Sequence, residues 1–514
     1  LKGITRLAES HPLLRDLVRA GTYDGDTSQS ARRKIRDEAN LILTNPDMLH
    51  RGILPYHAKW HRVFKRLRHV VVDEVHTYRG IFGSNVGNVF RRLRRVSAHY
   101  GAEPVFLCSS ATIRNPLELV ESLTGLPFTL VDDDGSPRGP KTFVWWNPPY
   151  LDAANMERRS GNVEAKQLFV RLVKRGVHTI VFTKARVVTE LIYKYAEEDL
   201  RRRRLGDAIK PYRGGYLPAE RREIERQLFG GDLLGVVATN ALELGIDIGA
   251  LDAAVLVGFP GTVASIWQQS GRAGRSRDEA LTVFVGYNDP IDQYLLRHPR
   301  YFFAQNPESA VCDPANPYVL AGHLSCAAFE LPLTEADRDL FGEEAQDVRE
   351  ILREDGELHG VEGEDYWSSP EFPARKVNLR TISDDTYTIV DTDRDDMVIG
   401  TVDAISAPEL VYPEAIYLHE GETFFVNELD LEKKIARVKR VSVDYYTQPV
   451  LDTSLRVRAE RERRAHGREE VELVDATVTW ATTMFKKIKF GNMDSIGYKN
   501  LDLPAQHLET VALG

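Results

Sequence analysis

Short apolar runs that each end in a polar cluster are the feature that most constrains the fold of this chain. Such runs stand at residues 41–43, 69–72, 105–108, 179–182, 235–238, 254–257 and 281–285. Continuous apolar strands separated by helical patterns indicate a parallel sheet covered by helices on both faces. Ligands of such sheets bind beyond the carboxyl ends of the strands, so we expect functional residues in the polar clusters.

The pattern is interrupted once, by a segment rich in Asp, Gly and Pro at residues 132–149, which is typical of a linker. The predicted fold class is therefore α/β, with two tandem lobes. We place lobe 1 at residues 1–143 and lobe 2 at residues 144–290.

The alternation of apolar runs and helical patterns ends after about residue 290. Short helical patterns broken by prolines, followed by a β-wing, predict a winged-helix-like domain at residues 291–375. Strand-like alternation punctuated by turns predicts a small β-barrel at residues 376–450. Residues 451–514 are expected to begin a further C-terminal module.

The composition excludes several classes of protein. Hydrophobic residues make up 42% and charged residues 28%, so the chain can bury cores and is not mainly disordered. Three cysteines cannot form a disulfide framework, which favours a reducing cytoplasm. No stretch has the roughly 18–20 uncharged apolar residues of a membrane span, so we expect no membrane partner. The net charge of −9 argues against a globally basic nucleic-acid binder but is compatible with a local basic groove.

The strongest single motif is Asp73-Glu74-Val75-His76, which follows a valine-rich run. Phosphoryl transfer from a nucleotide needs Mg²⁺ held by an acid and a water molecule poised in line. Asp73 would hold the metal through its waters, and Glu74 would orient and deprotonate the attacking water. The alternative is an acidic pair at a strand end with no catalytic role.

The second motif runs from Gln268 to Arg275. Its arginines, Arg272 and Arg275, suit a γ-phosphate because two guanidinium groups neutralise the charge that develops in the transition state. The alternative is an exposed basic turn. An acidic site on lobe 1 and an arginine pair on lobe 2 together predict a reaction centre between the lobes, which lobe closure would complete.

These motifs resemble those of the superfamily-two nucleic-acid helicases, which have two RecA-like lobes. The matching segments, for motifs Ib, II, III, IV, V and VI in order, are Thr44–Asp47, Asp73–His76, Ser110–Thr112, Val181–Thr183, Ala238–Asp247 and Gln268–Arg275. Tyr23–Thr27 and Asn316–His323 narrow the resemblance to the RecQ-like Hrq-type and mitomycin repair factor A subgroup. The resemblance implies an ATP-dependent DNA helicase that moves 3′ to 5′ on single-stranded or forked DNA and acts in DNA repair.

The resemblance also implies roles for individual residues. Gln268 would position the γ-phosphate or the attacking water, and Arg272 and Arg275 would be arginine fingers. His76 would couple the nucleotide cleft to the DNA channel. The other residues implied to bind nucleotide are Gly245, Asp247, which would face the ribose, and Gly271. The residues implied to face nucleic acid are Thr44, Asn45, Ser110, Thr112, Thr183 and Thr239, since small hydroxyls suit contacts to phosphates.

The chain departs from the family pattern in two motifs. It contains no Gly-x-x-x-x-Gly-Lys-[Ser/Thr] phosphate loop, and no cysteine follows Cys326, although the family has a module with four zinc-binding cysteines. We therefore expect a fragment whose phosphate loop would precede Leu1 and whose zinc module would follow Gly514. As written, the chain is expected to bind ATP poorly and to hydrolyse little of it.

Two other functions remain open from the sequence. An RNA helicase of the same superfamily would carry the same motifs, because the lobes read mainly phosphates. A non-catalytic nucleic-acid-binding scaffold would explain the missing phosphate loop. It would not explain why Asp73, Glu74, Arg272 and Arg275 are all present.

Weaker features have a structural interpretation beside a functional one. The basic run Arg32–Arg36 is as typical of a solvated helix face as of a DNA-binding patch. Trp145 and Trp146 could stack on bases, but packing at the start of lobe 2 is the favoured interpretation. Cys312, His323 and Cys326 are predicted to belong to a core helix, because their spacing fits no common zinc pattern and a fourth ligand is missing.

Overall fold

The computed structural model describes residues 2–25, 27–133, 135, 139–152, 154, 156–243, 251–274, 279–304, 306–380, 386–467, 469–490 and 495–513. The chain forms two compact units. The first unit contains Leu1–Gly135 and Gln305–Asp384, and the second contains Ser136–Ala304 and Asp385–Gly514. No helix among the described residues has the length and apolar character needed to cross a membrane.

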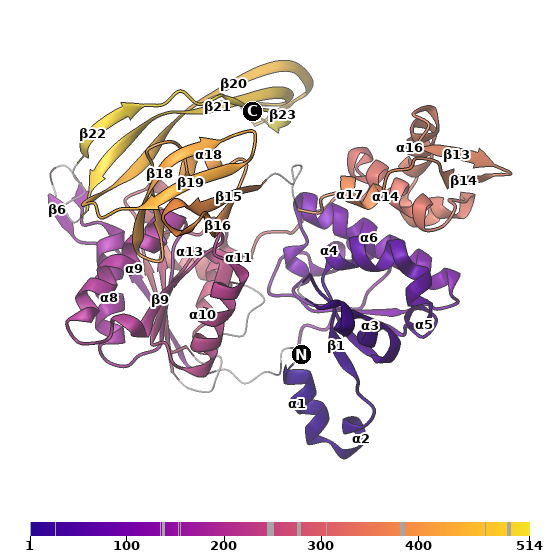
Figure 1. Cartoon of the computed structure of the whole chain (residues 1–514), viewed down its shortest axis with the longest axis horizontal. Helices are drawn as coiled ribbons and strands as arrows, with labels where there is room; N and C mark the ends of the chain where they lie inside the picture. Colours follow the sequence, from indigo (N-terminus) through magenta and orange to yellow (C-terminus); the bar gives the residue numbers. More distant parts are fainter. Residues whose placement is uncertain are drawn as a thin grey trace. The chain divides into compact units, whose positions relative to one another are not determined.

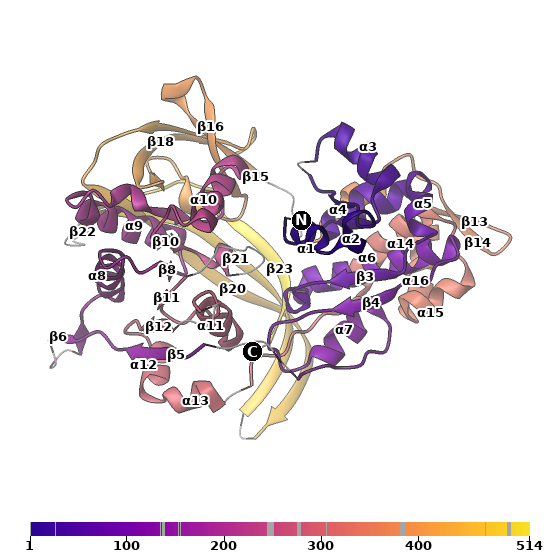
Figure 2. The same ribbon diagram turned by 90° about the horizontal axis from the view of Figure 1, so that it is seen from below.

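Lobe 1 lies in the first unit and is built on two pairs of parallel strands. β1 (Ala20–Thr22) pairs with β2 (Leu41–Leu43), and β3 (His69–Val72) lies beside β4 (Val105–Cys108), as Figure 2 shows. The helices of lobe 1 are α1 (Lys2–Ser10), α2 (Pro12–Arg15), α3 (Gln29–Glu38), α4 (Pro46–Met48), η1 (Leu49–Ile53), η2 (Leu54–Trp60), α5 (His61–Phe64), α6 (Gly80–His99) and α7 (Pro116–Thr124). The predicted parallel pairing is confirmed in both pairs.

One face of the β3–β4 pair differs from the prediction of a sheet covered on both sides. Val71 is 70% exposed, and Val105 and Leu107 are also exposed, whereas Val72 and Phe106 are buried. Side chains alternate between the two faces of a strand, so a single covered face buries every second residue. Among the described residues, helices cover only one side of this pair.

The winged-helix segment also belongs to the first unit. Its elements are α14 (Pro317–Glu330), α15 (Arg338–Phe341), α16 (Glu344–Glu354), the antiparallel pair β13 (Leu358–Val361) and β14 (Glu364–Trp367), and α17 (Pro373–Lys376). The fully buried Asp365 carboxylate of β14 accepts charge-assisted hydrogen bonds from Arg349 and Arg353 of α16, which fixes the wing to that helix. His323 and Cys326 are buried on α14, so the core-helix interpretation is confirmed for these two residues. It is wrong for Cys312, which is partly exposed and lies before the start of α14.

Lobe 2, drawn in magenta in Figure 1, lies in the second unit. It is built on a six-stranded sheet in which neighbouring strands all pair in parallel. Its order is β5 (Lys141–Trp146), β12 (Ala280–Val285), β11 (Ala253–Val257), β8 (Thr179–Phe182), β10 (Gly235–Ala238) and β9 (Ile209–Tyr212). The lobe 2 helices are α8 (Gly161–Val173), α9 (Arg186–Arg201), α10 (Pro218–Gly230) and α11 (Val263–Ser270). Ile180 and Phe182 join one core cluster and Val181 joins another, so both faces of the sheet are covered, as predicted.

Two boundaries of lobe 2 differ from the sequence analysis. The linker prediction for residues 132–149 is wrong in its centre, because 141–146 form the edge strand β5. Trp145 of this strand packs against Phe284 and Phe302, which confirms packing for that residue. Trp146 is 45% exposed, so packing is not confirmed for it. Helices α12 (Pro290–Arg297) and α13 (Pro299–Ala304) fall in the second unit, although the sequence pattern places their residues in the winged-helix-like domain.

The region after the winged-helix segment, for which the sequence predicts a small β-barrel at residues 376–450, is confirmed as strand-rich and forms two sheets. The first has the order β16 (Met397–Asp403), β15 (Thr386–Asp391), β19 (Ile435–Arg440), β18 (Glu422–Asp430) and β17 (Ile416–His419). Its hydrogen bonding, in the described residues, does not return from β17 to β16. The second contains the long hairpin β20 (Tyr445–His466) and β21 (Glu469–Lys489), with β22 (Ser495–Asn500) and β23 (Gln506–Leu513) paired to β21 (Figure 2).

Candidate functional site

The Asp73 carboxylate lies where β3 and β4 end side by side, because these strands pair in parallel with Val72 opposite Cys108. Its Oδ1 accepts hydrogen bonds from the Ser109 hydroxyl and from the backbone N–H of Glu74, the latter at 2.9 Å. Two backbone bonds of 2.9 Å, from Ser109 N–H to the Val72 carbonyl and from Val75 N–H to the Ser109 carbonyl, join the same two loops. The acidic loop is thus fixed to the loop that follows β4.

Glu74 holds a backbone conformation that L-residues rarely adopt. Its φ of 53° and ψ of 42° lie in the left-handed region, directly before the turn η3 (Val75–Thr77). The Thr77 hydroxyl donates a 2.8 Å hydrogen bond to the Glu74 carbonyl, which stabilises this turn. Such conformations cost on the order of 1–3 kcal/mol and gather at functional sites.

His76 connects the acidic loop to the Ser-Ala-Thr loop. It is 6% exposed, and its Nδ1 accepts a 3.0 Å hydrogen bond from the backbone N–H of Ala111. Burial, and then the nearby Arg79 guanidinium, lower the pKa of the imidazole. A backbone N–H can only donate, so Nδ1 carries no proton and the ring proton is on Nε2. That Nε2 is buried and has no hydrogen-bond partner within the described part of the chain.

The other lobe 1 residues predicted to face nucleic acid lie at strand ends and are exposed. Thr44 and Asn45 follow β2, and Ser110 and Thr112 follow β4. The Thr44 hydroxyl donates to the Tyr23 carbonyl at 2.8 Å, and Asn45 Oδ1 caps α4 by accepting from Met48 N–H at 2.8 Å. These bonds account for the local backbone, and contact with phosphates stays a prediction.

On lobe 2, Arg272 is buried against the loop that follows β10. Its guanidinium is 4% exposed and donates to the backbone carbonyl of Glu243, through Nε at 2.9 Å and also through Nη2. Gln269 of α11 donates at 2.9 Å to the Glu243 carboxylate. Motif VI is therefore tied to motif V through one residue, and the exposed-turn interpretation does not hold for Arg272. Gln268 is partly buried on α11, and Gly271 caps that helix.

Three predicted residues lie outside the described residues, namely Gly245, Asp247 and Arg275. Their roles stay predictions. Thr183 and Thr239 are described and are buried. The Thr183 hydroxyl is hydrogen bonded to Thr189 at 2.7 Å, and the Thr239 hydroxyl caps a short helix by accepting from Ala241 N–H at 3.5 Å. Contact between these hydroxyls and phosphates stays a prediction.

Sequence reasoning missed the two residues that hold the motifs together. Ser109 belongs to a polar cluster at a strand end but has no predicted role, and Glu243 counts only as part of motif V. For Ser109 a usable signal exists, because it follows a strand that pairs in parallel with the strand before Asp73. For the contact of Glu243 with Arg272 there is none, because the acceptor is a backbone carbonyl and every residue has one.

Models of known families match three parts of the chain. They are the DEAD/DEAH box helicase at residues 6–120, the helicase conserved C-terminal domain at 164–277, and the winged helix domain of ATP-dependent helicase HRQ1 at 312–382. The crystal structure of the DUF1998 helicase MrfA bound to DNA is 45% identical, with a TM-score of 0.89, and the match covers 100% of this chain and 69% of that one. The chain belongs to the Hrq1- and MrfA-type family of superfamily-two helicases.

Two curated members of this family are similar over most of the chain. The uncharacterized ATP-dependent helicase YprA of Bacillus subtilis is 47% identical over 96% of this chain and 66% of its own length. The ATP-dependent helicase hrq1 of Schizosaccharomyces pombe is 38% identical over 87% of this chain and 42% of its own length. The chain thus spans less than two thirds of each of these relatives.

Proposed function

We propose that this chain carries the motor lobes of an ATP-dependent DNA helicase, which moves 3′ to 5′ along one strand and acts in DNA repair. The observation that carries the proposal is a pair of hydrogen bonds made by the loop after β4. Ala111 of motif III donates to His76 of motif II, and Ser109, the residue before motif III, donates to Asp73. A motor needs the loop that hydrolyses ATP coupled to a loop that contacts nucleic acid. If Ser110 and Thr112 contact nucleic acid, as we propose, these bonds would supply that coupling.

The residues at the end of β3 fit a nucleotide-bound Mg²⁺ ion. Both described hydrogen bonds to the Asp73 carboxylate go to Oδ1, so Oδ2 is left for a water-mediated contact. When bound, Mg²⁺ with ATP supplies an activated phosphoanhydride whose charge is partly neutralised. Asp73 would hold the hydrated ion, and Glu74 would orient and deprotonate the attacking water. Arg272, with Arg275, would stabilise the γ-phosphate charge.

The proposed partner is single-stranded or forked DNA. The MrfA structure that resembles this chain contains DNA, and the curated relatives carry the name ATP-dependent helicase. We place the protein in a reducing cytoplasm, which agrees with the free thiols of Cys108, Cys312 and Cys326.

The proposal is tested by DNA-stimulated ATP hydrolysis, measured on the longest reading frame that contains this chain. Glu74→Gln should lower turnover about a hundredfold to ten-thousandfold, the usual value of a general base, while leaving affinity for single-stranded DNA unchanged. Glu103→Gln is the matched control, because Glu103 is exposed in the turn before the amino end of β4.

Three outcomes would contradict the proposal. Full turnover by Glu74→Gln would show that Glu74 is not the general base. Stronger stimulation by RNA than by DNA would favour an RNA helicase. DNA binding with no turnover in the wild-type protein would favour a scaffold.

A further inference from the structure

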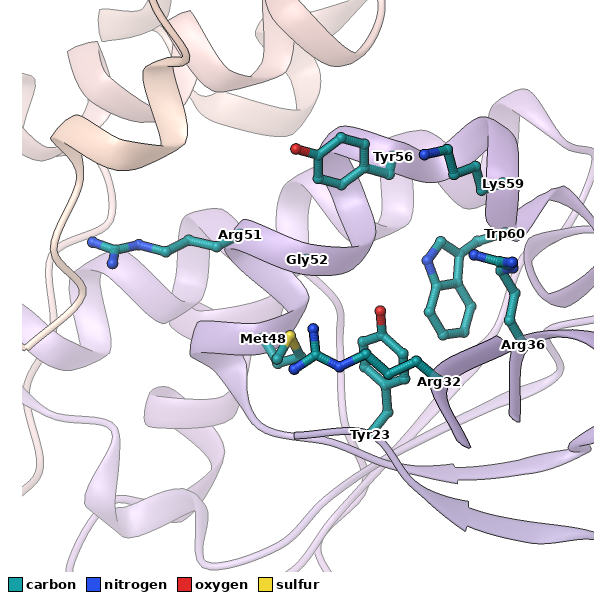
Figure 3. Close-up of a pocket in the computed structure, with 9 residues that line it drawn as sticks. All are labelled: Tyr23, Arg32, Arg36, Met48, Arg51, Gly52, Tyr56, Lys59 and Trp60. Atoms are coloured by element: carbon teal, nitrogen blue, oxygen red, sulfur yellow. The ribbon is translucent and has the colours of Figure 1, made fainter. Parts of the chain in front are cut away.

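A pocket of about 360 Å³ in lobe 1 is lined by aromatic and cationic side chains. It lies among the end of β1, helix α3, η1 and η2. Figure 3 shows the aromatic and cationic side chains around a shared space, except Arg51, which points away from the others. Three of its lining residues are aromatic and four are cationic, and none of the described residues that line it is acidic. The pocket uses none of the residues assigned to nucleotide hydrolysis above.

The aromatic side chains give the pocket a buried floor and an exposed rim. Tyr23 and Trp60 are 7% and 2% exposed and pack edge to face, with ring centroids 4.8 Å apart. Tyr56 is 44% exposed and its ring stacks on Phe372 at 6.1 Å. Tyr56 also breaks the helical backbone of η2, with φ of −114° and ψ of 27°. Figure 3 shows Tyr56 across the open space from Tyr23.

The cationic side chains are positioned by these rings and by the backbone. The Arg32 guanidinium lies 5.5 Å from the Tyr23 ring centroid and donates to the carbonyls of Asp24 and Gly25. Its Nε is buried and has no hydrogen-bond partner in the part of the chain described here. Lys59 Nζ lies 5.3 Å from the Tyr56 ring centroid. Positively charged groups held in place this way lose little freedom when an anion binds.

Among common ligands, a nucleotide is the class that uses both the aromatic and the cationic side chains of this pocket. Aromatic faces favour a flat base, and several cations without an acid favour a phosphate. The volume falls in the range of small-molecule sites, at about the size of one nucleotide. The pocket also adjoins motif Ib, because the Thr44 hydroxyl donates to the Tyr23 carbonyl at 2.8 Å and Met48 directly follows Asp47.

We propose that this pocket holds a single nucleotide, with its base against Tyr56 and Trp60 and its phosphate among Arg32, Arg36 and Lys59. The inference rests on the proposed function, since the nucleotide would belong to the DNA strand that the motor binds. A free nucleotide has the same chemistry and is the other source that the experiment separates.

The first arm measures the binding of a fluorescein-labelled 15-mer of deoxythymidine to the full chain by anisotropy, at several salt concentrations. The double variant Arg36→Gln with Lys59→Gln should bind at least tenfold more weakly, and its salt slope should fall by about 0.7 for each phosphate that the protein no longer neutralises. The matched control is Arg33→Gln with Lys34→Gln, which removes the same charge from exposed positions of α3. Arg33 and Arg36 both lie within 4.0 Å of the Asp37 carboxylate, so both variants disturb that pairing alike.

The second arm tests the base with an abasic oligonucleotide of the same length. Stacking on an aromatic ring predicts that the wild type prefers the normal strand about fivefold to a hundredfold. Tyr56→Ala should remove this preference and Tyr56→Phe should keep it. Because Tyr56 lies at the rim, the alanine variant is expected to fold, and its thermal unfolding curve checks this.

The outcomes separate this proposal from the proposed function. If DNA is bound but the pocket and control double variants weaken it equally, the pocket proposal is overturned while the motor function stands. If the wild type binds no oligonucleotide, the motor function fails, and deoxyadenosine monophosphate is tested by saturation-transfer NMR. Saturation transfer in the wild type that disappears in Arg36→Gln with Lys59→Gln would support a free nucleotide in the pocket. No saturation transfer in the wild type would overturn the pocket proposal.

Discussion

A buried ion pair holds the winged-helix segment to lobe 1. Arg92 of α6 and Glu330 of α14 are both fully buried and are joined by two hydrogen bonds, one of them 3.1 Å from Nε to Oε2. Arg92 Nη1 also donates to Nδ1 of His50 at 2.8 Å and of His323 at 3.3 Å. Removing the carboxylate charge would leave the guanidinium buried beside two histidines and without its anionic partner.

Glu330→Gln keeps the shape of the side chain and removes its charge. Breaking a buried ion pair from one side costs about 3–5 kcal/mol, because the remaining charge is uncompensated. Glu343→Gln is the matched control in the same unit. Glu343 pairs with Arg338 at 3.4 Å, and their side chains are 88% and 52% exposed, so its loss should cost less than about 1 kcal/mol.

Hydrogen exchange measured on peptides of the full chain is the suitable assay, because a chain with two compact units need not unfold in one step. Peptides from α6 and α14 should exchange at least about a hundredfold faster in Glu330→Gln, at roughly 1.4 kcal/mol for each tenfold. Peptides from lobe 2 should not change. Equal protection in Glu330→Gln and Glu343→Gln would refute the assignment of Arg92 as a buried, compensated charge.

Two further predictions concern the same kind of buried group. Burial, then the neighbouring guanidinium, lowers the pKa of His50 to about 3, and the pKa of His323 also lies well below its usual range. Below pH about 6.5 both histidines are therefore protonated in the unfolded chain but stay neutral in the folded chain. The free energy of unfolding of the first unit, measured by urea titration, should fall by about 1.4 kcal/mol per histidine between pH 7.5 and 5.5. An unchanged free energy of unfolding would contradict this. In the second unit, Arg213→Met should cost about 3–5 kcal/mol, because Glu190, 2.7 Å away and 1% exposed, would be left unpaired. Arg226→Met, in an exposed pair, should cost less than about 1 kcal/mol in the same urea titration, and equal costs would count against the argument.

The core of lobe 2 could be predicted because its strands carry the signal in every residue. A strand buried on both faces must be apolar throughout, and Thr179–Phe182 and Gly235–Ala238 are fully buried strands with the predicted bounds. Lobe 1 shows the limit of this reasoning. Its β3 run is equally apolar, yet Val71 is 70% exposed, since an apolar run does not reveal which faces are covered.

Strands that are flanked by polar segments or exposed to solvent were harder to predict. β5 is an edge strand between segments rich in Asp, Gly and Pro, and those flanks dominated the prediction. The long hairpin β20–β21 has charged residues along exposed stretches, including the pairs Arg461–Asp475 and Arg463–Glu472. Cross-strand pairs of opposite charge stabilise such a hairpin, but they are visible only once the register is known.

In the candidate site, the side chains that form the motifs could be predicted from the sequence, whereas their contacts with the backbone could not. Asp73, Glu74 and His76 could be placed from sequence, because parallel strands end together and their motif names the chemistry. The protonation state of His76 could not be placed, because it follows from the backbone N–H of Ala111, which leaves the only ring proton on Nε2. The contact of Arg272 could not be placed either, because its acceptor is a backbone carbonyl. A motif therefore predicts which groups a site contains, whereas the backbone around it decides which of their atoms are left to act.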